Sequence, residues 1–240
     1  MTRLRLQGGP SGSCDYCHGP LTSTYRTRDE WKWCSGHSTQ ACGACGRPCA
    51  PSGDRWTYCA ICTETIATDP LVVQRRCRQV LSFMDEIGLG VDHPVVVAEM
   101  SARGLKAERK SDSVLGFARW SKSGASAKPR IEIHLHERMP RWKMLATLAH
   151  EYGHAYLFAR DVLHLPPVLS EGFSEYVEYR FLVRFAPDHV QRRFLNGSHA
   201  RDDEYGEGFR VVATKVHQLG LERVVEILSS ETRDFRAFEM

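Results

Sequence analysis

The chain has 240 residues, of which 42% are hydrophobic and 25% are charged. This balance is typical of a folded globular protein and excludes a wholly disordered chain. No run approaches the ~20 apolar residues of a membrane-spanning helix, and a net charge of +3 is too small to indicate a nucleic-acid partner. Residues 1–13 contain two arginines but no apolar stretch, so they do not read as a secretory signal. We expect a flexible N-terminus over 1–13 and a cytoplasmic protein.

The nine cysteines all lie in the first 77 residues, and most belong to pairs separated by two residues. Disulfide frameworks suit small secreted domains, whereas paired cysteines without a secretion signal favour metal binding. The spacing leaves open whether consecutive pairs share an ion or whether the pairs cross, as in RING domains. Four pairs supply eight ligands, enough for two tetrahedral zinc ions: Cys14 and Cys17, Cys34 and His37, Cys42 and Cys45, and Cys59 and Cys62.

The segment from Cys14 to Cys62 resembles a LIM domain. Trp31 and Trp33 precede the Cys34/His37 pair, where LIM domains carry an aromatic residue, and Cys-His-Gly-Pro-Leu at 17–21 is similar to the turn after a LIM knuckle. The chain departs from the family in having Cys-x2-His where LIM domains usually have His-x2-Cys, and in a longer gap before Cys42. The resemblance implies a LIM-like domain over 14–66 with consecutive pairing: Cys14, Cys17, Cys34 and His37 at one structural zinc, and Cys42, Cys45, Cys59 and Cys62 at the other. In so small a module, zinc would supply most of the folding free energy.

Asp69-Pro70 marks the start of a second region, assigned to residues 67–240. Apolar residues from Leu71 to Leu89 recur with the period of a helix, and Cys77 falls among them as a buried apolar residue. In the last of three predicted strands, alternation places Ile131, Ile133 and Leu135 on one face. These strands are expected at 94–100, 114–120 and 130–136, with a Ser/Gly/Lys segment at 121–128 joining the second to the third.

The sequence His150-Glu151-Tyr152-Gly153-His154 has the form H-E-x-x-H. On a helix, His150 and His154 lie one turn apart on the same face, so both imidazoles reach one zinc ion. Glu151 lies beside them and is the candidate general base. The surrounding residues are mostly apolar, which predicts a buried helix. Two histidines and a glutamate in such a helix carry a desolvation cost that a metal offsets.

A third zinc ligand is expected at Glu171, which sixteen residues separate from His154. Pro166 and Pro167 interrupt the chain, so that a new helix starts near Ser170 as its N-cap. The two helices then run roughly antiparallel. Gly172 is expected to let the metal-bearing helix approach closely. Glu175 is one turn further along, where it can hydrogen-bond a ligating histidine, and Glu178 is expected to be solvated or ion-paired.

His-Glu-x-x-His followed by Glu171-Gly172 resembles the gluzincin metallopeptidases. Tyr-Gly-Glu-Gly-Phe-Arg at 205–210 and Val-His-Gln-Leu-Gly-Leu at 216–221 are similar to the C-terminal signature of the LIM-containing, ubiquitin-activated peptidases first known as plant growth regulators (DA-one-like). The match covers most of 14–228 discontinuously, with Glu207 where that family has Asp. It implies an α+β chain with an antiparallel sheet and active-site helices, with His150, His154 and Glu171 as ligands and Glu151 as base. No ubiquitin-interacting helix precedes Cys14, so we expect a minimal, bacterial-type member without established ubiquitin control.

These residues predict a zinc endopeptidase acting on proteins or peptides, with three zinc ions, one catalytic and two structural. Tyr205, Arg210 and His217 are the candidates for stabilising the oxyanion, and the strand at 130–136 is a candidate to pair with substrate. The LIM-like domain would bind a protein partner or substrate. Two alternatives stay open: a non-catalytic zinc-finger interaction protein, and a peptidase that cleaves transcription regulators. Few basic residues lie between Cys34 and Cys62, which argues against DNA binding.

Overall fold

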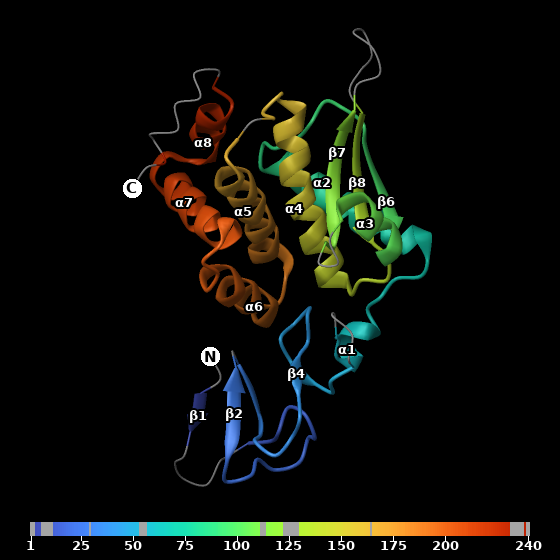
Figure 1. Cartoon of the computed structure of the whole chain (residues 1–240), viewed down its shortest axis with the longest axis vertical. Helices are drawn as coiled ribbons and strands as arrows, with labels where there is room; N and C mark the ends of the chain where they lie inside the picture. Colours follow the sequence, from blue (N-terminus) through green and yellow to red (C-terminus); the bar gives the residue numbers. More distant parts are fainter. Residues whose placement is uncertain are drawn as a thin grey trace.

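The computed structural model has two parts, a small cysteine-rich module and a larger region of helices around one sheet (Figure 1). The chain is therefore of mixed α and β structure, as predicted. None of the described helices combines the length and hydropathy that crossing a bilayer requires. The structure describes residues 12–28, 30–52, 57–110, 114–121, 130–163, 165–230 and 238, together with the backbone of 3–5.

Two small antiparallel sheets form the cysteine-rich module. One contains β1 (Arg3–Arg5), β2 (Tyr25–Arg28) and β3 (Trp31–Cys34), and the other contains β4 (Gln40–Ala41) and β5 (Pro48–Cys49). The first encloses a core of only a few buried residues, among them Trp31 and Trp33. Such a core is too small to stabilise the module by burial alone, as the cysteine spacing suggested.

The flexible N-terminus expected over 1–13 falls mostly outside the described residues. Its described backbone at Arg3–Arg5 is not free but pairs with β2 as an edge strand. This pairing satisfies backbone groups that the edge of β2 would otherwise leave unpaired.

The module contacts the larger region through Glu30, which forms an ion pair with Arg192 of α6 (Asp188–His199). His189 of the same helix lies 3.8 Å from Glu30 and packs edge-on against the Trp31 ring at 5.7 Å. The indole nitrogen of Trp31 donates to the carbonyl of Cys45. Trp31 thus connects the two halves of the module and the module to α6.

Helix α2 (Pro70–Glu86) begins where the sequence predicted and ends three residues early. The Asp69 side chain accepts a hydrogen bond from the Leu71 amide, and Pro70 occupies the first turn, where a missing N–H costs nothing. Gly88 ends the helix in a left-handed conformation (φ 77°). Its buried face carries Cys77, Val80, Phe83 and Met84, so Cys77 is an apolar core residue as expected.

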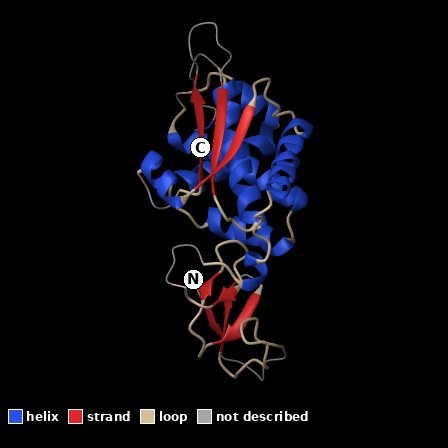
Figure 2. Cartoon of the chain, turned by 90° about the vertical axis from the view of Figure 1, so that its right-hand side faces the viewer, coloured by secondary structure: helices blue, strands red, loops and turns tan. Residues whose placement is uncertain are grey.

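One three-stranded sheet forms the side of the larger region that faces the viewer in Figure 2. Its strands are β6 (Val95–Met100), β7 (Gly116–Ser121) and β8 (Arg130–His136), in the order β6-β8-β7, and α3 (Ala102–Arg109) follows β6. The buried face of β8 carries Ile131, Ile133 and Leu135, as the alternation predicted. Residues 122–129, which include most of the expected Ser/Gly/Lys connection, lie outside the described residues.

The expectation of an antiparallel sheet holds for β7 and β8 but is wrong for β6, which runs parallel to β8. After β6 the chain passes through α3 to the far edge of the sheet, where β7 runs antiparallel to β6. It then reverses into β8, which therefore runs in the same direction as β6 and lies between the two. The central position of β8 also corrects its proposed role with substrate. Both edges of β8 are already paired, so it cannot accept an added strand.

The remaining helices pack beside the sheet: α4 (Arg141–Ala159), α5 (Pro167–Phe185), α7 (Glu204–Leu219) and α8 (Leu221–Leu228), with α6 between α5 and α7 in sequence. Helix α5 lies between α4 and α7 (Figure 1). It begins at Pro167, one turn before the expected start, since proline fits the first helical position. Ser170 is therefore inside the helix and is not its N-cap.

Two glycines allow the helices around α5 to approach closely, but not in the expected arrangement. A Cβ added to Gly172 would lie 2.3 Å from the carbonyl carbon of Gly208 in α7, so Gly172 faces α7 and not α4, the helix of the H-E-x-x-H motif. The close approach of α4 to α5 instead depends on Gly153, where a Cβ would lie 2.7 Å from Cα of Ser174. The glycine inside the H-E-x-x-H motif thus serves the helix packing.

We expect Gly172→Ala to destabilise the protein by about 1–3 kcal/mol, because the added methyl overlaps backbone atoms that cannot rotate away. Gly197→Ala in α6 is the matched control, since a Cβ there meets nothing within 4 Å and alanine favours the helix. Unfolding in denaturant measures both. Equal stability of the two variants would contradict the packing of α5 on α7.

Candidate metal centres and active-site cleft

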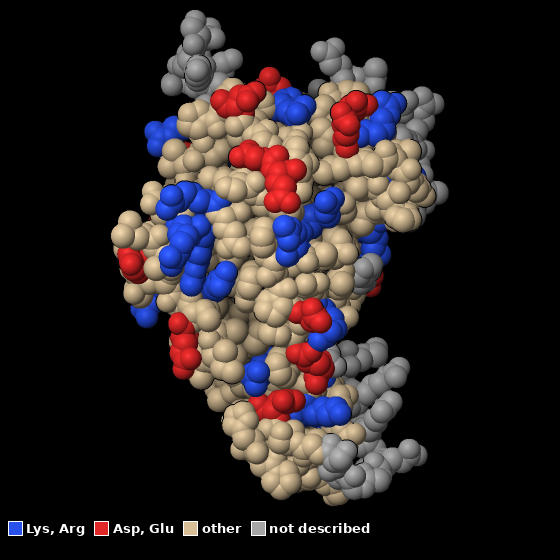
Figure 3. Space-filling view, turned by 180° about the vertical axis from the view of Figure 1, so that it is seen from behind, with Lys and Arg blue, Asp and Glu red and all other residues tan. Residues whose placement is uncertain are grey.

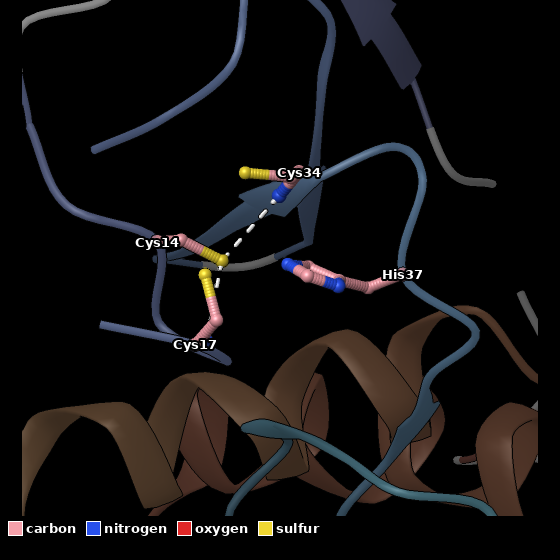
Figure 4. A group of neighbouring side chains, drawn as sticks. All are labelled: Cys14, Cys17, Cys34 and His37. Carbon is pink, nitrogen blue, oxygen red and sulfur yellow. Dashed lines mark hydrogen bonds between the residues drawn. The ribbon is translucent and has the colours of Figure 1, made fainter. Parts of the chain in front are cut away.

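The first cysteine cluster brings together Cys14, Cys17, Cys34 and His37 (Figure 4). Their ligand atoms all lie within 4.8 Å of one another. Backbone amides of Tyr16, Cys17 and Cys34 point at the Cys14 sulfur from 3.4–3.5 Å. Burial raises the pKa of Cys14, but these amide hydrogen bonds outweigh it and lower the pKa to about 6. The cluster therefore favours the thiolate that zinc requires.

The imidazole of His37 supports the same conclusion. Its Nε2 is buried and has no hydrogen-bond partner among the described residues. A buried nitrogen left in this state costs free energy unless another group satisfies it. A zinc ion at the centre of the cluster would do so.

The second cluster contains Cys42, Cys45, Cys59 and Cys62, again with all sulfurs within 4.8 Å. The sulfurs of Cys45 and Cys59 are 3.8 Å apart, and four sulfurs at 2.3 Å from a tetrahedral zinc would lie about 3.8 Å apart. Hydrogen bonds from the other three thiols lower the pKa of Cys42 far below its usual range. The spacing and the thiolate character both fit a zinc ion.

Consecutive pairs share each cluster, so the structure has the arrangement that the LIM resemblance implied and not the crossed one. Cys49 belongs to neither cluster. Its thiol lies 3.5 Å from the carbonyl of Gln40, and burial raises its pKa to about 11, so it is a protonated bystander.

We expect the purified chain to carry three zinc ions: one in each cysteine cluster, and one at the group formed by His150, His154 and Glu171. The cysteine clusters should release zinc to a chelator more slowly than the histidine site, because seven of their eight ligands are cysteines. Metal analysis before and after timed chelation measures both quantities. One zinc or fewer in folded protein would contradict the assignment of the cysteine clusters.

The H-E-x-x-H motif lies in the middle of α4, with the rings of His150 and His154 5.1 Å apart. Helix α5 brings Glu171 to both of them: its Oε2 lies 3.2 Å from Nε2 of His150 and 3.3 Å from Nε2 of His154. Ligands about 2.1 Å from a tetrahedral zinc lie about 3.4 Å apart. The three atoms are therefore spaced as zinc ligands, and they leave a fourth position for water or substrate.

The electrostatics of this group also fit a cation. No hydrogen bond of regular geometry reaches the buried Oε2 of Glu171 from the described residues. Burial lowers the pKa of His150, but Glu171 and the other nearby carboxylates outweigh it and raise the pKa to about 9. Burial raises the pKa of Glu171, whereas the two histidines lower it below its usual range overall. Positive charge is thus favoured at this point, and a metal ion would replace the proton on His150.

Glu151 follows His150 in α4 and is only 7% exposed. Burial is the main cause of its raised pKa. It lines the same cleft as the two histidines and Glu171. A buried carboxylate with a raised pKa, next to a metal site, is suited to accept and return a proton.

Side chains of α5 lie near Nδ1 of both histidines, the nitrogen that faces away from Glu171. Ser170 Oγ lies 3.3 Å from Nδ1 of His154. Glu175 and Glu178 lie 3.7 and 3.6 Å from Nδ1 of His150. Glu175 therefore lies near one of the two motif histidines, as expected, but beyond direct hydrogen-bond distance.

One of these side chains differs from the expectation and another matches part of it. Glu178 is not solvated, but it lies 3.6 Å from Nδ1 of His150 as an ion-pair partner, which was the other arm of the expectation. Burial, followed by repulsion from Glu175, raises its pKa to about 7. Ser170, expected as a helix cap, is instead a partner of His154. The spacing of Ser170, Glu171, Glu175 and Glu178 on one helix placed all four near one face, but the assumed helix start concealed the role of Ser170.

We expect Ser170→Ala to weaken binding of the catalytic zinc by about 10–100-fold, the usual cost of losing a partner of a ligating histidine. Serine fixes the ring of His154 with Nε2 directed at Glu171, and alanine leaves that ring free to rotate. Competition with a zinc-binding dye measures the affinity. Ser174→Ala is the control, since Ser174 lies on the same helix and its buried hydroxyl has no hydrogen-bond partner among the described residues.

The group of His150, His154 and Glu171 opens into a cleft of about 560 Å³. One wall is the β7 edge of the sheet, including Gly116 and Phe117. The opposite wall contains Tyr205, whose ring stacks at 6.1 Å from that of His150. Arg201, which the sequence did not indicate, lies over the Tyr205 ring at 4.3 Å and is held by Asp203.

Of the three oxyanion candidates, the structure brings only Tyr205 to the cleft. Arg210 does not line it and instead donates to the carbonyl of Arg201. His217 is exposed in the last turn of α7, about 18 Å along the helix from Tyr205 at 1.5 Å per residue. The C-terminal sequence signature that suggested these three residues therefore contains one residue of the cleft, Tyr205. Arg210 instead bonds to the chain before α7, and His217 lies near the end of that helix.

No family model matches the chain, and the comparisons with curated proteins and with solved structures find no match.

Proposed function

We propose that the chain is a zinc-dependent endopeptidase of gluzincin type, with a LIM-like module before its catalytic region. The observation that supports it most directly is the position of Glu171 Oε2, 3.2–3.3 Å from Nε2 of both motif histidines. Glu151 is buried at the same cleft, where a proton acceptor is needed.

A zinc ion held by His150, His154 and Glu171 would polarise a carbonyl group and lower the pKa of water towards ~7. Glu151 accepts a proton from the attacking water and passes it to the amine that leaves. The Tyr205 hydroxyl donates a hydrogen bond to the carbonyl oxygen as negative charge develops there. Burial, with Glu171 and Glu204 nearby, raises the pKa of Tyr205 to about 12, so this hydroxyl keeps its proton at neutral pH.

The β7 edge is the element suited to hold the main chain of a substrate. Its first three residues, Gly116, Phe117 and Ala118, line the cleft, and β8 pairs with only one of its sides. An extended peptide adds to such an edge by backbone hydrogen bonds with little dependence on side chains. We infer protein or peptide substrates, with the LIM-like module as the surface for a protein partner.

The test is cleavage of a mixture of unstructured proteins, with mass spectrometry of the new N-termini. The wild-type protein should produce termini that are missing after removal of the weakly held zinc and return when zinc is added. Glu151→Gln should produce none of them. Identical termini from all samples would identify a contaminating protease and contradict the proposal.

A further inference from the structure

The junction between the zinc module and the catalytic region centres on Thr65, three residues after the ligand Cys62. The Thr65 hydroxyl donates to the carbonyl of Cys62 at 2.7 Å and accepts from the Arg141 amide at 3.0 Å. Its carbonyl accepts from Nη2 of Arg76 at 2.7 Å. The last zinc knuckle, α2 and the first residue of α4 therefore meet at one residue.

A hollow of about 300 Å³ lies beside this junction, and three arginines line it. Its described lining contains no acidic residue and consists of Val72, Arg75, Arg76, Gln79 and Arg141. The face of the molecule seen from behind shows a group of basic side chains to the left of centre, with no acidic atoms inside the group (Figure 3). Three guanidinium groups thus converge without a negative partner.

Arg76 shows that this positive charge is uncompensated. Its Nη1 is buried and has no hydrogen-bond partner among the described residues. Burial lowers the pKa of Arg76, and repulsion from Arg141 and Arg75 lowers it further. Arg141 stacks over Trp142 at 4.8 Å, and neither it nor Arg75 pairs with a carboxylate in the described part of the chain. A buried donor without an acceptor is costly, and a bound anion would remove that cost.

We propose that Arg75, Arg76, Gln79 and Arg141 bind the phosphate group of a small soluble phosphate compound. Guanidinium groups match the oxygens of phosphate in pairs, and three of them suit a doubly charged group better than a single carboxylate. Helix α4 begins at Arg141 without a side-chain cap, so the positive end of its dipole adds to the attraction. The size of the hollow admits phosphate with a small organic substituent.

Isothermal titration calorimetry tests the site: inorganic phosphate is added to the zinc-loaded full chain at constant ionic strength, and the heat of binding is measured. We expect saturable binding that chloride does not reproduce. Arg75→Gln should weaken it at least tenfold, and this variant should fold normally because Arg75 is exposed and forms no hydrogen bond or ion pair with another described residue. Arg76→Gln and Arg141→Gln should also weaken phosphate binding at least tenfold. Arg78→Gln, an exposed arginine of the same helix outside the hollow, should bind like the wild type.

Equal affinity in Arg75→Gln and Arg78→Gln would overturn the site, and so would binding in the wild type that chloride reproduces. Phosphate bound at the catalytic zinc would survive all three substitutions in the hollow, and this outcome also counts against the proposal. O-phosphoserine should compete with phosphate for the hollow. If the chain binds vesicles that contain phosphatidic acid but neither soluble compound, the ligand is a membrane surface and the proposal is wrong. The readout is independent of peptide cleavage, so it stands or fails separately from the proposed function.

Discussion

Replacement of Glu151 by glutamine should lower the rate of peptide cleavage by about 10²–10⁴-fold, the usual contribution of a general base. The amide is close in size to the carboxylate but cannot accept a proton. Glu151 is not among the residues grouped as ligands, so the variant should keep all its zinc. The measurement combines initial rates on a peptide identified from the cleavage mixture with metal analysis of the same sample.

Glu222→Gln is the matched control, because Glu222 is exposed on α8 and lies outside the cleft. It removes the same charge and should cleave at the wild-type rate. Retention of wild-type activity by Glu151→Gln would assign the proton transfer to another group. Loss of zinc from Glu151→Gln would instead mean that the side chain supports the metal site.

Glu171→Ala should remove the catalytic zinc while both cysteine clusters remain filled. Only two histidine nitrogens then remain of the described group of three, which contains no carboxylate other than Glu171. Glu175 and Glu178 approach His150 at Nδ1, whereas Glu171 approaches it at Nε2, on the other side of the ring. Metal analysis should therefore find two zinc ions for each chain and no cleavage activity.

The comparison with Glu175→Ala and Glu178→Ala makes this prediction specific. Each should weaken the catalytic zinc by about 10–100-fold without removing it at saturating zinc, because each acts through His150. His150, Glu175 and Glu178 also have ligand atoms close enough to hold an ion of their own. If Glu175→Ala empties the site and Glu171→Ala leaves it filled, the metal is bound on the Nδ1 side of His150.

The sequence predicted well those features that depend on residues only a few positions apart. The alternation in β8 and the one-turn spacing of His150 and His154 follow from local backbone geometry, and so do the paired cysteines. Glu171 could be anticipated because a proline break and a new helix leave few ways to reach the histidines. Local spacing was sufficient in each case.

The features that were missed depend on which elements become neighbours. The direction of β6 depends on the crossover through α3, and the central position of β8 follows from the same topology. Burial of Glu178 depends on packing around α5, which no residue of α5 itself reveals. Arg201 reaches the cleft from the connection between α6 and α7, and its position is set by Asp203 and Tyr205 in the folded chain.

The contact between Gly172 and Gly208 has a consequence for how the cleft responds to mutation and evolution. Gly172 follows Glu171, and Gly208 is three residues beyond Tyr205, so the point where α5 and α7 touch lies next to the proposed third zinc ligand and close to Tyr205 of the cleft. The spacing of these two groups is therefore fixed by main chain against main chain and not by adjustable side chains. A larger residue at either glycine would move Tyr205 relative to Glu171. In the proposed peptidase, substrate preference would therefore be more readily altered along β7 than along this pair of helices.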